Sequence, residues 1–108
     1  MQSVDLTNLR EMTDGDTELE RNLFAEFMRS FEDCLTKLQA SVDEAGQEVW
    51  RSNAHAMKGI SYNLGATPLG DLCKKAQEEH QSPTSTKDSL LNSIMVEYEK
   101  VKDFLTKI

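Results

Sequence analysis

A histidine, a lysine and a glycine stand about one helical turn apart between Ala54 and Ala66. His55, Lys58 and Gly59 occupy positions i, i+3 and i+4, so in a helix they share one small patch of surface. A neutral imidazole is a nucleophile, and a lysine beside it suits an anion that arrives on the ring. Histidine, cation and room for a partner to dock together favour the acceptance of a phosphoryl group.

Gly59 is the least expected member of this set, because glycine inside a helix costs about 1 kcal/mol relative to alanine. On a helical wheel the core-facing side lies opposite His55, and this side holds Val49, Trp50, Asn53, Met57, Ile60 and Leu64. Gly59 therefore does not serve the core, and we expect something to come close to the backbone there. His55 should be at least partly exposed, although a lone histidine on a polar face is more often simply solvated.

The polar face around His55 carries further candidate residues. It comprises Glu48, Arg51, Ser52, Lys58, Gly59 and Tyr62. Arg51 and Lys58 disfavour the charged form of the ring by like-charge repulsion, which keeps the imidazole neutral and nucleophilic. Arg51, Ser52 and Tyr62 are candidates for the rim of the site.

Hydrophobic periodicity predicts helices along the whole chain, and no segment alternates like a strand. The predicted helices span residues 4–12, 17–45, 47–64, 68–80 and 87–108. Thr17 and Glu20 form a T-x-x-E capping box at the start of the second helix. Gly65 suits the end of the third helix, and Thr67 as N-cap with Pro68 at N1 suits the start of the fourth.

Two of these helices have long apolar stripes. The second carries Leu19, Leu23, Phe24, Phe27, Met28, Phe31, Leu35 and Leu38. The last carries Leu91, Ile94, Met95, Tyr98, Val101, Leu105 and Ile108. Long amphipathic helices with short connections predict an all-α fold, an antiparallel four-helix bundle with an additional short N-terminal helix as a lid. At 108 residues, we expect a single domain over residues 1–108.

Composition excludes several classes of partner. The formal charge of −7 argues against nucleic acid and against an anionic membrane surface. No run of eighteen apolar residues predicts a membrane span, and the N-terminus lacks the features of a secretory signal. Cys34 and Cys73 are therefore interpreted as reduced thiols in a cytoplasmic protein, with a disulfide as the lesser alternative.

The sequence offers little for other catalytic chemistry. It has no glycine-rich phosphate loop, no serine–histidine–acid arrangement and no H-E-x-x-H motif. His80 lies at a helix end beside acidic residues and is interpreted as a surface residue. A metal site built from His55, His80 and acidic residues lacks a recognisable spacing, so we expect this chain to bind no metal and no cofactor.

The stretch HAMKGISYNLGA closely resembles the signature of histidine-containing phosphotransfer (HPt) domains, His-x-x-Lys-Gly followed by Gly-Ala at the helix end. Here these residues are His55, Lys58, Gly59, Gly65 and Ala66. The opening LREMTDGDTELERNLFAEF is similar to the first helix, turn and second helix of the family. The resemblance covers essentially the whole chain.

The resemblance implies a four-helix bundle with a fifth, shorter helix, and it implies that His55 is the phospho-acceptor. Such domains receive a phosphoryl group from the aspartate of one receiver domain and pass it to the aspartate of another, without kinase activity of their own. Lys58 would stabilise the phosphorylated ring, and Gly59 would let the receiver approach. Gln77 stands where the family often has a glutamine that hydrogen-bonds the histidine. The implied partners are receiver domains of a hybrid histidine kinase and of a response regulator, and Mg²⁺ would belong to the receiver.

Two alternatives stay open from the residues alone. The chain could be a helical adaptor that binds receivers without phosphotransfer, or a domain cut from a larger hybrid sensor kinase. Met1 and a helix that reaches Ile108 favour a free-standing protein, and a monomer is the default expectation. Leu6 and Leu9 in the first helix are hypothesised to extend the docking surface, the alternative being that this helix simply covers the apolar band of the second.

Overall fold

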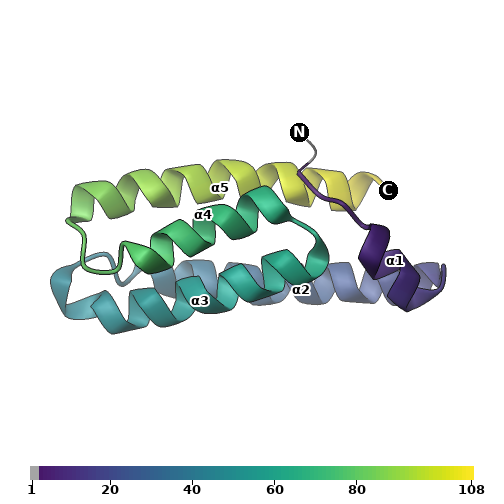
Figure 1. Ribbon diagram of the computed structural model, residues 1–108, viewed down its shortest axis with the longest axis horizontal. Helices are drawn as coiled ribbons and strands as arrows, with labels where there is room; N and C mark the ends of the chain where they lie inside the picture. Colours follow the sequence, from purple (N-terminus) through teal and green to yellow (C-terminus); the bar gives the residue numbers. More distant parts are fainter. Residues whose placement is uncertain (1–2) are drawn as a thin grey trace.

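The apolar stripes of four long helices face one another in an antiparallel bundle, and a short helix crosses one end (Figure 1). The computed structural model describes residues 3–108, so Met1 lies outside it. The elements are α1 (Thr7–Thr13), α2 (Thr17–Gln39), the 3-10 turn η1 (Glu44–Gly46), α3 (Gln47–Leu64), α4 (Thr67–Glu78) and α5 (Thr84–Lys107). The expectation of an all-α bundle with an additional N-terminal helix is confirmed.

Aromatic side chains join α2 to α5 in the core. Phe27 and Phe31 from α2 pack against Tyr98 from α5, and the Phe31 and Tyr98 rings stack with their centroids 4.5 Å apart. The Tyr98 hydroxyl donates a hydrogen bond to the Glu32 carboxylate at 2.5 Å. Lys102 Nζ lies 3.4 Å from the same oxygen of Glu32. Apolar packing and a charge-assisted hydrogen bond therefore hold this pair of helices together.

Some positions of the predicted stripes do not face the core. Leu19, Met95 and Ile108 are exposed, as is Val49 on α3. Leu19 and Ile108 lie at chain positions where a helix begins or ends, and Val49 and Met95 lie at the margins of their stripes. Asn53 is half-buried, and its amide donates to the Val49 carbonyl instead of entering the core.

The ends of α2 differ from the prediction. Asp16 is the N-cap, because its carboxylate accepts the Leu19 backbone N–H at 3.0 Å. The expected capping box of Thr17 and Glu20 is therefore wrong, and Glu20 is buried instead. The helix ends at Gln39 and not near Ala45–Gly46. The chain turns at Ala40 and Ser41, and Glu44–Gly46 then form the separate 3-10 segment η1.

Other boundaries also move, and the first helix begins at Thr7 and ends at Thr13 instead of spanning residues 4–12. Ala66 is the N-cap of α4, so Thr67 is the first helical residue and not the cap, and α4 ends at Glu78 before His80. The last helix begins at Thr84, three residues before the predicted start. Pro83 is extended and its carbonyl accepts the N–H of Lys87 at 3.2 Å, which makes Pro83 the N-cap.

Trp50 ties α3, α4 and α5 together at one end of the bundle. Its indole is fully buried, and its Nε1–H donates to the Ala76 carbonyl of α4 at 2.7 Å. Lys87 of α5 is also buried, with its ammonium group 5.2 Å from the centre of the indole ring. A cation over an indole face is attractive, and this contact lets a lysine lie inside the bundle.

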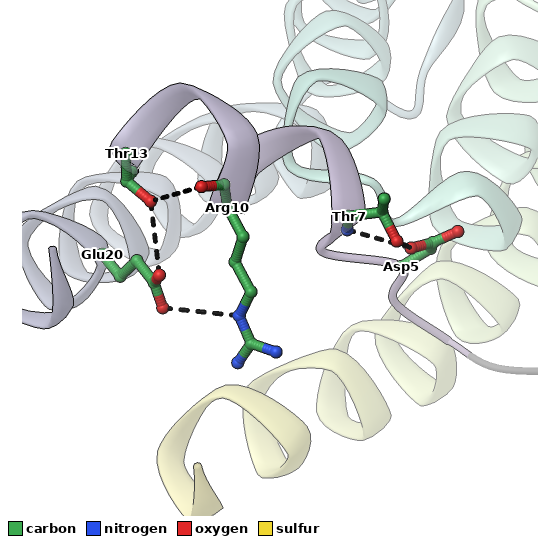
Figure 2. Close-up of polar contacts among 5 residues, drawn as sticks. All are labelled: Asp5, Thr7, Arg10, Thr13 and Glu20. Carbon is green, nitrogen blue, oxygen red and sulfur yellow. Dashed lines mark hydrogen bonds and ion pairs between the residues drawn. The ribbon is translucent and has the colours of Figure 1, made fainter. Parts of the chain in front are cut away.

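The N-terminal segment and α1 are anchored by the polar contacts that Figure 2 shows. The Asp5 carboxylate accepts hydrogen bonds from the backbone N–H and the hydroxyl of Thr7, at 3.0 and 2.6 Å. At the other end of α1, the Thr13 hydroxyl donates to Glu20 at 3.3 Å, and Arg10 Nε lies 3.6 Å from the second oxygen of that carboxylate. Glu20 therefore fastens α1 to the start of α2.

Leu6 and Leu9 are buried and belong to the main core, together with Phe24 and Phe27 of α2. These leucines are thus not available to a partner, and the hypothesis that they extend a docking surface is wrong. The N-terminal segment covers the apolar band of α2, as the alternative stated.

Tyr98→Phe is expected to destabilise the protein in a pH-dependent way. The Tyr98 hydroxyl lowers the pKa of Glu32 below its ordinary value of 4.5. A lowered folded-state pKa gives stability that is present above about pH 4.5 and lost as the pH falls through the lowered value. The Glu32 side chain is 48% exposed, and solvent weakens the interactions of an exposed charge. We therefore expect Tyr98→Phe to lower the free energy of unfolding at pH 7 by only about 1 kcal/mol.

Urea denaturation of the wild type and Tyr98→Phe at pH 7 and pH 3 measures this effect. The difference between the two proteins should shrink at pH 3. An equal difference at both pH values would assign the loss to packing and not to the Glu32 hydrogen bond.

Candidate functional site

His55 stands in the middle of α3 on the face that the core does not use. The buried residues of this helix are Trp50, Ala54, Met57, Ser61 and Leu64. His55 is exposed, as the wheel predicted, and so are its neighbours Arg51, Ser52 and Gly59. The fold therefore leaves the imidazole ring open to solvent while the opposite side of the same helix is buried.

The turn that follows α3 determines what lies beside His55. Gly65 has φ +96°, its N–H donates to the Tyr62 carbonyl at 3.0 Å, and the Ala66 N–H donates to the Ser61 carbonyl at 2.9 Å. This is a Schellman motif, which confirms the predicted role of Gly65. The Gly65 carbonyl also accepts the N–H of Asp5 at 2.9 Å, and α4 then runs back along α3 (Figure 1).

Gln77 of α4 is brought beside the histidine by this reversal. Its Oε1 lies 3.4 Å from Nδ1 of His55. An amide oxygen can only accept a hydrogen bond, so the contact requires a proton on Nδ1. The lone pair of the neutral ring is then on Nε2. With the amide oxygen of Gln77 facing the ring, the neutral imidazole that fits this contact is the Nδ1–H tautomer.

Lys58 and Arg51 do not contribute equally to the charge around the ring. Lys58 is half-buried, and no ion pair to it occurs within residues 3–108. Arg51 is bound to Glu48, with 3.0 Å between Nη2 and the carboxylate, and this hydrogen bond lowers the pKa of Glu48. Arg51 is therefore paired with a carboxylate on the surface of α3, whereas Lys58 is not paired in this part of the chain.

Gly59 is open to the solvent and supports no packing of its own chain. A Cβ built at this position meets no other atom within 4 Å. Neither the helix nor the bundle requires a glycine here, in contrast to Gly65, where a Cβ would lie 1.9 Å from the Asp5 carbonyl oxygen. This agrees with the reasoning that Gly59 does not serve the core.

Tyr62 is held against α4 by two residues that the sequence did not mark as related to it. Its hydroxyl donates to Asp71 at 2.6 Å, and this bond raises the pKa of Tyr62 to about 12. Its ring lies over Gly70, where a Cβ would come within 2.4 Å of the ring.

The remaining candidate groups do not form a second centre. His80 is half-buried, and its Nδ1 lies 3.1 Å from the Gln77 carbonyl oxygen. Cys34 and Cys73 are free thiols, and burial raises the pKa of Cys73 to about 12. Over residues 3–108, no three histidine, cysteine or acidic side chains gather as metal ligands.

In the same part of the chain, no helix has the length and apolar character that crossing a membrane requires.

Comparison with known proteins gives one family. A family model described as "Hpt domain" matches residues 22–105, which include α3, α4 and most of α2 and α5. The match leaves α1 outside. No curated protein and no solved structure matches the chain.

Gly59→Ala and Gly65→Ala are expected to change stability in opposite directions. Alanine at 59 meets open space and gains helix propensity, so the free energy of unfolding should rise by about 1 kcal/mol. Alanine at 65 must adopt a left-handed φ and displace Asp5, so the free energy should fall by at least about 1 kcal/mol. Urea denaturation of both variants checks the pair, and a destabilised Gly59→Ala would contradict the account of position 59.

Proposed function

The chain belongs to the Hpt domain family, and on that premise we propose that it is the intermediate of a phosphorelay with His55 as the phospho-acceptor. Members of the family are histidine phosphotransfer carriers and not kinases. The observation that carries the proposal is the contact of His55 Nδ1 with Gln77 Oε1 at 3.4 Å on an otherwise exposed ring. It leaves Nε2, the ring nitrogen that does not contact Gln77, as the nucleophile of an exposed side chain.

In the proposed transfer, the Nε2 lone pair of His55 attacks the phosphorus of an aspartyl phosphate. The N–P bond forms as the bond from phosphorus to the aspartate oxygen breaks, and the aspartate leaves as a carboxylate with that electron pair. Nε2 carries no proton, so none has to be removed. The ring keeps its Nδ1 proton and becomes cationic, which strengthens its hydrogen bond to Gln77. The reverse sequence delivers the group to a second aspartate.

Lys58 supports the phosphorylated state in this proposal. It stands one turn from His55 on the same face, and its charge has no carboxylate partner within the described part of the chain. The phosphoryl oxygens carry the negative charge that a free ammonium group binds. This chain supplies no metal in the scheme, and Mg²⁺ is assigned to the receiver.

The proposed partners are the receiver domains of a hybrid histidine kinase and of a response regulator, met in the cytoplasm by a monomer of this chain. Family membership supports receiver domains as the class of partner. The partner's aspartate must come within bonding distance of Nε2. Gly59, one turn from His55, leaves open space there, so a receiver loop can lie against the helix backbone.

Label transfer from a phosphorylated receiver tests the acceptor. Receiver domains encoded in the same genome are phosphorylated with labelled acetyl phosphate and Mg²⁺, separated from the reagent and mixed with the wild type, His55→Gln and His80→Gln. Label should reach the wild type and His80→Gln as an acid-labile, base-stable adduct, and should not reach His55→Gln. Because the chain has two histidines, His80→Gln is a matched control. Label on His55→Gln, or binding without transfer by every receiver, would refute the proposal, and the second result would favour an adaptor.

Gly59→Ala separates docking from stability in the same assay. We expect transfer to slow by roughly tenfold to a hundredfold, because a methyl group displaces the approaching aspartate from its line of attack. The variant should at the same time be more stable than the wild type. An unchanged second-order rate constant would show that the open space at position 59 is not used.

A further inference from the structure

Tyr62 combines a fixed conformation with exposure to solvent. Its hydroxyl is bound to Asp71 at 2.6 Å and its ring rests on the site where Gly70 lacks a side chain. Yet 38% of the residue remains exposed. An aromatic ring that is already immobilised loses little conformational entropy when a partner packs against it, which is why such rings serve as anchors in interfaces.

Tyr62 lies within the area that any receiver must cover to reach His55. Seven residues separate the two along α3, which corresponds to an advance of about 10 Å and a rotation of only about 20°. A standard interface covers about 800 Å² on each partner, equal to a disc of about 16 Å radius. A receiver centred on His55 therefore extends over the Tyr62 ring.

The charge beside the ring indicates what the partner presents there. The Tyr62 hydroxyl uses one oxygen of Asp71, and no cation is paired with Asp71 among residues 3–108. An aromatic face next to a carboxylate suits a lysine or arginine, whose stem packs on the ring while its charge reaches the acid. An acidic side chain at the same place would be repelled. The His55 end of the surface has the opposite polarity, because Lys58 is unpaired in that part of the chain.

We propose that Tyr62, fixed by Gly70 and Asp71, is a specificity-determining contact that selects receiver domains carrying a basic side chain about 10 Å from the phosphorylated aspartate. This inference rests on the proposed function and adds the residue that discriminates among receivers. Tyr62 is not a catalytic residue, since it touches neither the imidazole of His55 nor the transferred group.

The test compares transfer from phosphorylated receivers with direct chemical labelling of His55. The receivers are those that label the wild type, and kcat/KM is measured for Tyr62→Ala, Tyr62→Phe, Asp71→Asn and Phe104→Ala. Phosphoramidate labels His55 without docking: its P–N bond breaks, an N–P bond to Nε2 forms and ammonia leaves. Phe104→Ala is the matched control, because Phe104 on α5 is also 38% exposed.

We expect Tyr62→Ala to lower kcat/KM roughly tenfold for receivers with the basic side chain and less for the others. Tyr62→Phe, which keeps the ring over Gly70 but loses the hydrogen bond to Asp71, should lower kcat/KM less than Tyr62→Ala does. Asp71→Asn, which keeps an acceptor for the hydroxyl but loses the charge, should cost about threefold and flatten the salt dependence. Phe104→Ala should stay within about twofold of the wild type.

Three results would overturn the inference. The first is a wild-type kcat/KM for Tyr62→Ala on every receiver. The second is a loss equal across all receivers, and the third is an equal loss in phosphoramidate labelling, which would place the defect in the ring of His55 and not in docking. In each case the wild type still accepts label, so the proposed function stands; a wild type that accepts no label refutes the proposed function itself.

Discussion

The left-handed turn at Gly65 is the constraint on which the site depends. The turn closes α3 with two backbone hydrogen bonds, accepts a third from Asp5, and sends α4 back along α3. The register of the two helices follows from it, and this register brings Gln77 to His55 and Gly70 to Tyr62. A side chain at Gly65 would meet the carbonyl of Asp5, so the N-terminal segment and the α3–α4 pair can adopt their observed positions only together.

The two sides of α3 obey different requirements. One side holds the bundle together through fully buried Trp50 and Met57. The other side keeps His55 exposed and, at Gly59, leaves a volume that nothing in the described chain occupies. A helix designed for stability alone would carry alanine at that position. The glycine is therefore explained by an external partner better than by the fold, in line with the general expectation that functional positions depart from the most stable choice.

Sequence reasoning succeeded where one residue type has one structural use. Gly65 was recognised as a helix end because few other residues adopt its φ, and His55 was placed on the polar face by periodicity alone. Contacts between distant segments were beyond it: nothing in the sequence links Asp5 to Gly65, and nothing in it places the Tyr62 ring over Gly70. The N-cap of α2 was missed by one residue, since neighbouring aspartate and threonine are both good N-caps and only the backbone decides between them.

The burial of Trp50 has a consequence for how this protein can be observed. It is the only tryptophan of the chain, and its indole is enclosed between α3, α4 and a lysine of α5, on the side of α3 away from His55. Its fluorescence therefore reports on the integrity of the scaffold, with the blue-shifted emission of a dry environment that turns red when the bundle opens. A ligand on the exposed face would leave the signal almost unchanged. A variant that loses activity but keeps the Trp50 emission of the wild type has lost function and not structure, and one fluorescence spectrum of the same sample makes this distinction.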